Sequence, residues 1–543
     1  MHPTHLGLTR LTLTSSLLLA LGACSGGSSS PPVTTPPVLE LPLSKRVSGD
    51  TPVAAACTGG STTGSVFVNA EVEPFVVADP HNSGHLIAAW QQDRWTDGGS
   101  RAMVSATSFD GGQSWSRFLH PMSRCGGGTR ANGGDYARVS DPWVDIGPSG
   151  VAYAMALGIS GNAGAAETNA MLASRSTDGG VTWSAPATLI LDGPAFFNDK
   201  NSLTADPIDA NFVYAVWDRL NQSGGGGPTY LARSVDAGIS WEPARAIYTP
   251  AGGGQTIGNR IMVLPDGTLV DVFTQIDTRG AVNTHLDVIR SVDKGATWSA
   301  PIRIAAQQAV GAHDPQTGVP IRDASILGSI AVGPDGTLWV TWQDGRFSGG
   351  QRDAVALSRS TDGGLSWSAP VAINRDTGTE AFIPIVHVRA DGTAGVMHYD
   401  LRSDTNDPAT LLADAWLLSS ADGVVWSETK VWGPFDVAGA PRVTAGYFLG
   451  DYQGLTSIGT RFLPVLVMSS TDTSNRTDVY ALGLDGLANA QAYSSAVRRT
   501  QQHAEGALSS AQFAQRVSQN IVRRMEQRLP GWSQRFTGKA PEQ

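Results

Sequence analysis

The chain carries a short hydrophobic pattern that recurs about every 60 residues. Each copy has a β-branched, alternating stretch, a turn containing Pro, Asp or Gly, and a second apolar stretch that in most copies ends in an aromatic residue. Alternation of this kind indicates paired β-strands. The six copies span residues 75–90, 144–156, 203–217, 261–273, 330–342 and 385–399.

A second motif, Ser-x-Asp-x-Gly-x-Ser/Thr-Trp, follows each copy. It occupies residues 108–115, 176–183, 234–241, 291–298, 360–367 and, shortened, 420–426. Asp can accept hydrogen bonds from its own turn, Gly supplies a positive φ, and Trp packs the turn onto a sheet. These are structural features of a hairpin and not catalytic ones. The motif resembles the Asp box of sialidases and other bacterial-neuraminidase-repeat propellers.

A third strand leads into each box and a fourth leaves it, so the repeating unit is a four-stranded antiparallel blade. We therefore predict an all-β fold, a single β-propeller over residues 51–487. Residues 454–458, 462–468 and 479–484 form a seventh copy without a box, whose outer strand we assign to residues 65–70. Counting the copies of the two-strand pattern gives seven blades, which we favour. Counting boxes gives six, the number in catalytic sialidase domains.

The start of the chain is typical of an export signal. Arg10 precedes an apolar stretch over residues 11–21 that is too short to cross a bilayer. Residues 21–24, Leu-Gly-Ala-Cys, resemble a bacterial lipobox. We expect residues 1–23 to be removed, Cys24 to carry lipid and Ser25 to direct the lipoprotein to the outer membrane. The alternative is an ordinary secretory signal with a chance Cys. Residues 24–50, rich in Gly, Ser and Pro, predict a tether.

Two further features concern the body and the C-terminus. Cys57 and Cys125 remain as a pair, for which a disulfide is the default in an oxidising compartment and two separate thiols the alternative.

Residues 488–543 lose the strand pattern and carry 8 Lys+Arg against 3 Asp+Glu. An apolar residue at every fourth position from 513 to 529 predicts a short helical tail. It either packs on the propeller or binds a membrane surface or a partner.

Composition narrows the function classes. Only 16% of the residues are charged, 63 are Gly and the net charge is −10. This profile argues against a coiled coil and against a nucleic-acid-binding protein, which usually has a basic face. No metal-ligand spacing, phosphate-binding loop or serine-nucleophile elbow is present, so we expect no metal and no cofactor.

Candidate chemistry gathers on the propeller face formed by loops that enter the inner strands and loops that follow the second strands. Five second strands are followed by an Asp/Arg pair, whose arginines we expect near one rim of the propeller. These predicted binding residues are Arg94, Arg219, Arg279, Arg346 and Arg402, together with Arg260, Trp95 and Trp143 from the same face. One interpretation is a set of loop braces. The other is a bowl for a glycan or another polar or anionic ligand, since arginine binds carboxylates with two parallel hydrogen bonds.

The resemblance to sialidases implies a Tyr nucleophile assisted by a Glu and an Asp acid/base. Asp451-Tyr452-Gln453 is similar to the tyrosine segment of that family, and ring closure would bring Glu73 near Tyr452, with Asp141 as the acid/base. The family's arginine motif is absent from blade one, which reads Glu73-Pro74-Phe75-Val76. Our leading hypothesis is an exported, lipid-anchored, sialidase-like glycoside hydrolase. The alternative is a non-catalytic propeller that binds glycan or protein on the same face. The oligomeric state stays open.

Overall fold

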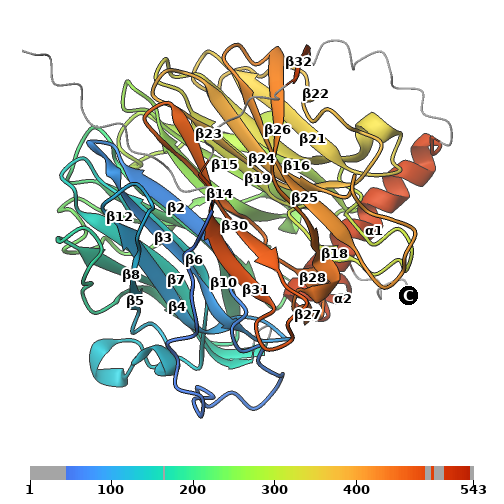
Figure 1. The fold of residues 1–543 in the computed structure, drawn as a ribbon. Helices are drawn as coiled ribbons and strands as arrows, with labels where there is room; N and C mark the ends of the chain where they lie inside the picture. Colours follow the sequence, from blue (N-terminus) through green and yellow to red (C-terminus); the bar gives the residue numbers. More distant parts are fainter. Residues whose placement is uncertain (1–43, 163–164, 225, 484–490, 495–506, 538–543) are drawn as a thin grey trace, which may run out of the picture. The chain divides into compact units, whose positions relative to one another are not determined.

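The computed structural model describes residues 44–162, 165–224, 226–483, 491–494 and 507–537. The signal peptide, Cys24 and most of the tether therefore lie outside the described residues. The described chain is almost entirely β-structure, with two α-helices near its C-terminal end (Figure 1).

The strands form seven blades, each a four-stranded antiparallel sheet, and the first two blades share one continuous sheet. The strands of each blade are given from the inner strand outward. Blade one is β2 (Val72–Asp79), β3 (Asn82–Arg94), β4 (Ser100–Ser108) and β5 (Ser116–Leu119); blade two is β6 (Arg138–Ile146), β7 (Ala152–Asn162), β8 (Ala165–Ser176) and β9 (Ala187–Asp192); blade three is β10 (Phe196–Ala205), β11 (Val213–Asn221), β12 (Thr229–Ser234) and β13 (Arg245–Tyr248); and blade four is β14 (Gln255–Val263), β15 (Leu269–Asp277), β16 (Asn283–Ser291) and β17 (Ile302–Gln307). Blade five is β19 (Gly328–Val332), β20 (Leu338–Asp344), β21 (Ala354–Ser360) and β22 (Val371–Ala372); blade six is β23 (Ala381–Val388), β24 (Ala394–Asp400), β25 (Leu412–Ser420) and β26 (Val425–Asp436), extended by β32 (Gln491–Ser494); and blade seven is β29 (Gly454–Ile458), β30 (Arg461–Ser469), β31 (Thr477–Ala481) and β1 (Lys45–Arg46).

The seven inner strands close a ring. Each contacts the inner strand of the next blade, and β29 returns to contact β2. The aromatic residues of the second strands, among them Trp90, Trp217 and Trp342, are completely buried between blades. The prediction of a propeller is confirmed, and the described residues form seven blades rather than six.

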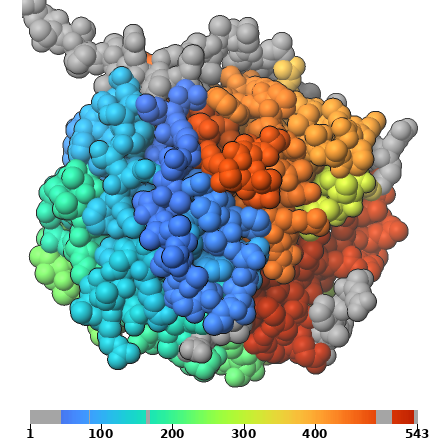
Figure 2. Space-filling model, turned by 60° about the horizontal axis from the view of Figure 1, so that its bottom comes forward, coloured from blue at the N-terminus to red at the C-terminus, as the bar shows by residue number. Residues whose placement is uncertain are grey.

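The outer strand of the last blade does not come from residues 65–70, so that prediction is wrong. It is β1, which pairs with β31, and Figure 2 shows the first part of the chain (blue) directly beside the last blade (orange). The guanidinium of Arg46 lies 2.5 Å from Asp478, and Val47 is buried. Residues 65–70 make only isolated bridges, at Val66 and Ala70. Residues 45–46 of the expected tether therefore belong to the ring.

The boxes form the expected hydrogen-bonded turns. In the second copy Ser176 Oγ donates to Asp178 at 2.7 Å, and Asp178 accepts from both the N–H and the hydroxyl of Thr182. The same pattern recurs in the other four full-length copies. Because every bond stays within one turn, the boxes stabilise hairpins and take no part in the ring centre.

Outside the blades, three short strands and the C-terminal helices cover one face. The short strands are β18 (Ile321–Arg322), β27 (Arg442–Val443) and β28 (Gly446–Phe448). Cys57 and Cys125 form the predicted disulfide, which ties the segment before blade one to the loop after β5.

The predicted C-terminal helix is α1 (Ser510–Arg528), followed by α2 (Trp532–Thr537). The apolar stripe of α1 is buried with Leu220, Ile257, Ile276 and Val310 of blades three to five. It therefore packs on the propeller, as the first of the two alternatives predicted. None of the described helices combines the length and apolar character needed to span a membrane.

The Asp-box turns can be tested with Asp178→Ala. The substitution removes three hydrogen bonds from one turn, and we expect it to cost about 1 kcal/mol of unfolding free energy because the carboxylate is exposed. Denaturant unfolding measures the loss. Any activity per folded molecule should be unchanged; an inactive variant of wild-type stability would contradict a structural role.

Candidate active site at the ring centre

The inner strands carry a β-bulge at one recurring position. The register shifts there in blades one, two, three, four and six. The bulged residues have positive φ values and are Glu73 (54°), Asp141 (52°), Lys200 (47°), Gly258 (71°) and Ile383 (53°). This backbone region is strained for any residue except Gly, by about 1–3 kcal/mol. Bulges re-aim side chains, and here they bring three ionisable groups from consecutive blades together.

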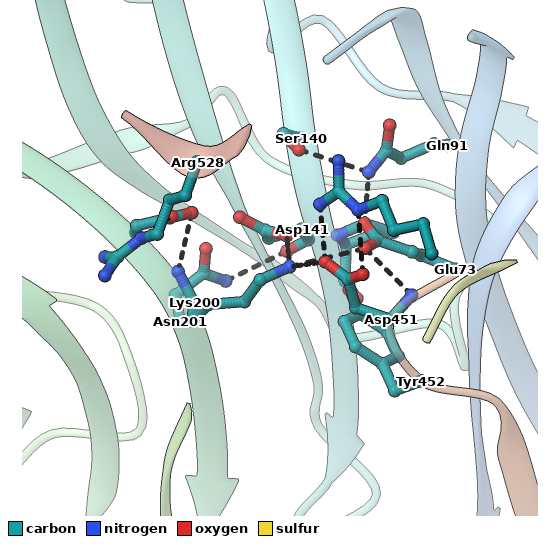
Figure 3. Close-up of polar contacts among 12 residues, drawn as sticks. Glu73, Gln91, Ser140, Asp141, Lys200, Asn201, Asp451, Tyr452 and Arg528 are labelled. Atoms are coloured by element: carbon teal, nitrogen blue, oxygen red, sulfur yellow. Dashed lines mark hydrogen bonds and ion pairs between the residues drawn. The ribbon is translucent and has the colours of Figure 1, made fainter. Parts of the chain in front are cut away.

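Lys200 lies at the middle of this group (Figure 3). Its Nζ is 3.3 Å from Glu73 Oε1, 3.0 Å from Asp141 Oδ1 and 2.6 Å from Asp451 Oδ2. All three carboxylates are buried. Burial alone would disfavour the ammonium, but the carboxylates of Asp141, Asp451 and Glu73 outweigh it and raise the pKa of Lys200. The ammonium therefore stays charged.

Asp451 precedes blade seven and contacts two more cations. The guanidinium of Arg322 binds it in a bidentate manner, at 2.9 and 2.5 Å, and Arg524 Nη2 lies 3.3 Å away. Burial would raise the pKa of Asp451, but Arg322 and Lys200 hold it well below its usual range. Asp451 is therefore a fixed negative charge.

Asp141 behaves in the opposite way. Burial raises its pKa well above the usual value, helped by the nearby Asp199 and Glu73 and opposed by Lys200. Asp199, with which Asp141 shares a hydrogen bond, has a lowered pKa because Arg528 and Lys200 outweigh its burial. The two environments shift the pKa values of two neighbouring carboxyls in opposite directions, a difference that acid/base catalysis can use.

Tyr452 lies beside the same cluster. Its ring makes an edge-to-face contact with the ring of Trp143, with 5.5 Å between the ring centroids. Its hydroxyl donates to the Pro142 carbonyl at 3.0 Å. Burial and the charges of Glu73 and Asp141 raise the pKa of Tyr452 well above its usual value. Ring closure thus brings Tyr452 close to Glu73, as predicted, while Glu73 itself accepts from the backbone N–H of Asp451 at 3.2 Å.

The predicted rim arginines do not converge. Four of them brace loops: Arg219 on Asp192, Arg279 on the Gly252 carbonyl, Arg346 on Asp344, and Arg402 on Asp400 and Glu428. For these four arginines the interpretation as structural braces fits the geometry, because each guanidinium contacts a carboxylate or a carbonyl of its own or a neighbouring segment.

The other predicted binding residues lie closer to the axis. Arg94 is buried, donates to Gln91 at 2.6 Å and stacks over Phe448. Arg260 stacks on Trp143, which is buried. Trp95 is also buried, with Arg138 over its ring at 4.6 Å, so it offers no free stacking surface.

The C-terminal helix supplies two residues that the sequence analysis missed. Arg524 contacts the Asp323 carbonyl and Asp451, while Arg528 contacts Asp199 and Asp218. Sequence spacing gives no sign of these pairs. Lys200, Arg322 and Asp451 were also unassigned. For Lys200 the signal that could have found it is its place in the inner strand, which is the same as that of Glu73 and Asp141.

Below the cluster, a cavity of about 60 Å³ lies in the central channel. Its lining includes Trp143, Lys200, Arg260, Asp451 and Tyr452. In the described ranges no group of three His, Cys, Asp or Glu residues could hold a metal ion. The groups that the ring centre offers for chemistry are the carboxyl of Asp141, the phenol of Tyr452 and the charges of Lys200 and Asp451.

The chain is similar to proteins that are named for acting on glycans. It is 27% identical over 192 residues to a xyloglucanase from Paenibacillus sp. and 26% identical over 305 residues to a sialidase from Micromonospora viridifaciens. These matches cover 32% and 49% of this chain but 16% and 42% of the relatives, so the chain spans less than half the length of either. No family model matches.

Among solved structures, the Hadza microbial sialidase Hz136 is 18% identical, with a TM-score of 0.43 over 74% of this chain and 73% of that one. A Penicillium chrysogenum α-L-arabinanase is 15% identical, with a TM-score of 0.43 over 66% and 94%. The match to the sialidase sequence agrees with the boxes and the blades: the chain resembles the sialidase-like β-propeller superfamily.

Proposed function

We propose that the chain is an exported, lipid-anchored glycoside hydrolase of sialidase-like type that acts on glycans at the ring centre. One observation carries this proposal. Tyr452, Glu73 and Asp141, which come from three separate parts of the chain, meet in one buried cluster around Lys200. The similarity to a sialidase and a xyloglucanase supports it.

The proposed chemistry divides the work among these three residues. Asp141, whose pKa is raised chiefly by burial, donates a proton in its protonated form to the leaving oxygen of the glycosidic bond. Tyr452 attacks the sugar carbon as the glycosidic bond breaks, and Glu73 takes the phenolic proton. For this step the Tyr452 hydroxyl has to exchange its bond to the Pro142 carbonyl for one to Glu73. Water then attacks the same carbon, the Asp141 carboxylate takes a proton from it, and the departing Tyr452 oxygen regains its proton from Glu73.

A second candidate, a non-catalytic propeller that binds glycan or protein on this face, also has a specific observation in its favour. Lys200 neutralises the carboxylates that would do the chemistry. The cavity beside Tyr452 has room for about two water molecules. A space of that size is smaller than a sugar ring.

Tyr452→Phe separates the two candidates. It removes the nucleophilic oxygen and keeps the ring against Trp143, so folding should survive while hydrolysis falls by several orders of magnitude. The measurement is a panel of aryl glycosides, including the sialoside, with the purified body.

Tyr399→Phe is the matched control, because Tyr399 also donates to a backbone carbonyl, that of Val467 at 2.8 Å, but lies in blade six. It should lose stability without losing activity. Unimpaired hydrolysis by Tyr452→Phe contradicts the mechanism, and no hydrolysis by the wild type across the panel supports the binding function.

The role of Asp141 predicts a pH profile. Its folded-state pKa is raised, so the protonated, active form is present at low and neutral pH and is lost as the pH rises through that pKa. Asp141→Asn should abolish this decline. It should slow substrates with poor leaving groups far more than activated aryl glycosides, which need little proton donation. Equal slowing of both substrate classes would argue against an acid role.

The membrane anchor has its own test. Cys24→Ser should leave no lipid-modified product and should release the protein from the outer-membrane fraction. Cell fractionation and intact-mass measurement read out both effects. Wild-type protein that is already soluble and carries no lipid would show that the lipobox interpretation is wrong.

A further inference from the structure

A groove of about 1010 Å³ lies on the central face, away from the carboxylate cluster. One wall is α1, and the other is formed by residues 280–282 after β15 and residues 310–318 between β17 and β18. Most of its polar side chains are hydrogen-bond donors or amides, including His313, Arg516, Asn520 and Arg523.

Arg516 and Arg523 differ from the other arginines of α1. Arg524 and Arg528 each contact carboxylates of the ring centre. Arg516 donates to the Gly350 carbonyl and Arg523 to the Asn520 side chain, and neither forms an ion pair with any residue in the described ranges. Nε of Arg523 is buried without a hydrogen-bond partner. A partly buried guanidinium without a counter-charge is costly, unless a ligand supplies one.

The acidic groups behind this wall form no ion pair with the two arginines among the described residues: Asp353 accepts from the backbone N–H groups of Val310 and Gly311, and Glu380 lies 3.4 Å from His313. Burial and mutual repulsion raise the pKa of Glu380 well above its usual value, and burial together with Asp323 raises the pKa of Asp353 to about 8. Both carboxyls are thus shifted toward the protonated form. Glu526 also lines the groove, but its carboxylate accepts from the backbone N–H groups of Gly531 and Ser533 at the start of α2.

We propose that this groove binds an acidic oligosaccharide, whose carboxylates pair with Arg516 and Arg523. A guanidinium fork matches a carboxylate in shape as well as charge. The two arginines are seven positions apart on α1, about 10 Å along the axis, so the ligand has to present carboxylates at more than one place, as a chain of uronic acids does. Val282, Val310 and Val522 add apolar contacts for sugar rings.

The choice of a sugar as carrier of the carboxylates rests on the proposed function, whereas the recognition of anions does not. The test is isothermal titration of the full-length protein with trigalacturonate, with the neutral galactotriose of the same linkage and with inorganic sulfate. Trigalacturonate should bind at least tenfold more tightly than either. Arg516→Gln and Arg523→Gln should each weaken it about tenfold or more, and Arg523→Lys should recover part of the loss.

Arg535→Gln is the matched control, because it removes the same charge from α2 outside the groove, where Arg535 donates only to backbone carbonyls. It should bind like the wild type. Equal affinity for trigalacturonate and galactotriose, or unchanged binding by both glutamine variants, overturns the proposal. Sulfate binding as tightly as trigalacturonate overturns the sugar part of it.

Two further measurements keep the result interpretable. Thermal melting shows whether a variant is folded; should Arg523→Gln unfold, the half-buried Arg516 decides the outcome. Tyr452→Phe should bind trigalacturonate like the wild type. Binding is measured without turnover, so failure of the hydrolase proposal leaves this result unaffected, and failure here leaves hydrolysis at the ring centre open to its own test.

Discussion

The contact of one ammonium group with three carboxylates holds the centre of this propeller together. Lys200 of blade three joins Glu73 of blade one, Asp141 of blade two and Asp451 at the entry to blade seven. Blades that are first and last in the chain are thereby connected at the axis, while β1 connects them at the rim. Because a buried charge without its partner is strongly destabilising, the loss of any one member exposes the others to that cost.

The repeated bulge explains how a uniform scaffold carries chemistry at one point. The same left-handed position is filled by Glu, Asp, Lys, Gly and Ile in five different blades. Only Gly is free of strain there. The other four residues keep this conformation in spite of the strain, and three of them meet in one ion-pair cluster. The same bulge therefore presents a different side chain in each of these blades.

Sequence periodicity predicted the blades, the boxes and the helical stripe, because these depend on local spacing. It missed β1, since Lys45 and Arg46 are only two residues between Pro- and Gly-containing stretches and pair with a strand more than 430 residues away. It also left two interpretations of the rim arginines open. An Arg that follows an Asp by two residues can bind that Asp, as Arg346 does, or a more distant backbone carbonyl, as Arg279 binds that of Gly252. Spacing alone does not distinguish the two outcomes.

The C-terminal helix shows why the central face cannot be understood from the blades alone. Its apolar stripe anchors it on blades three to five, and this anchoring fixes which arginines face inward. Arg524 and Arg528 enter a carboxylate-rich centre and are neutralised there. Arg516 and Arg523 instead line the groove, where neither forms an ion pair with a described residue. One segment thus places two arginines in the acidic centre and two in the groove beside it, so the two places differ in their local charge.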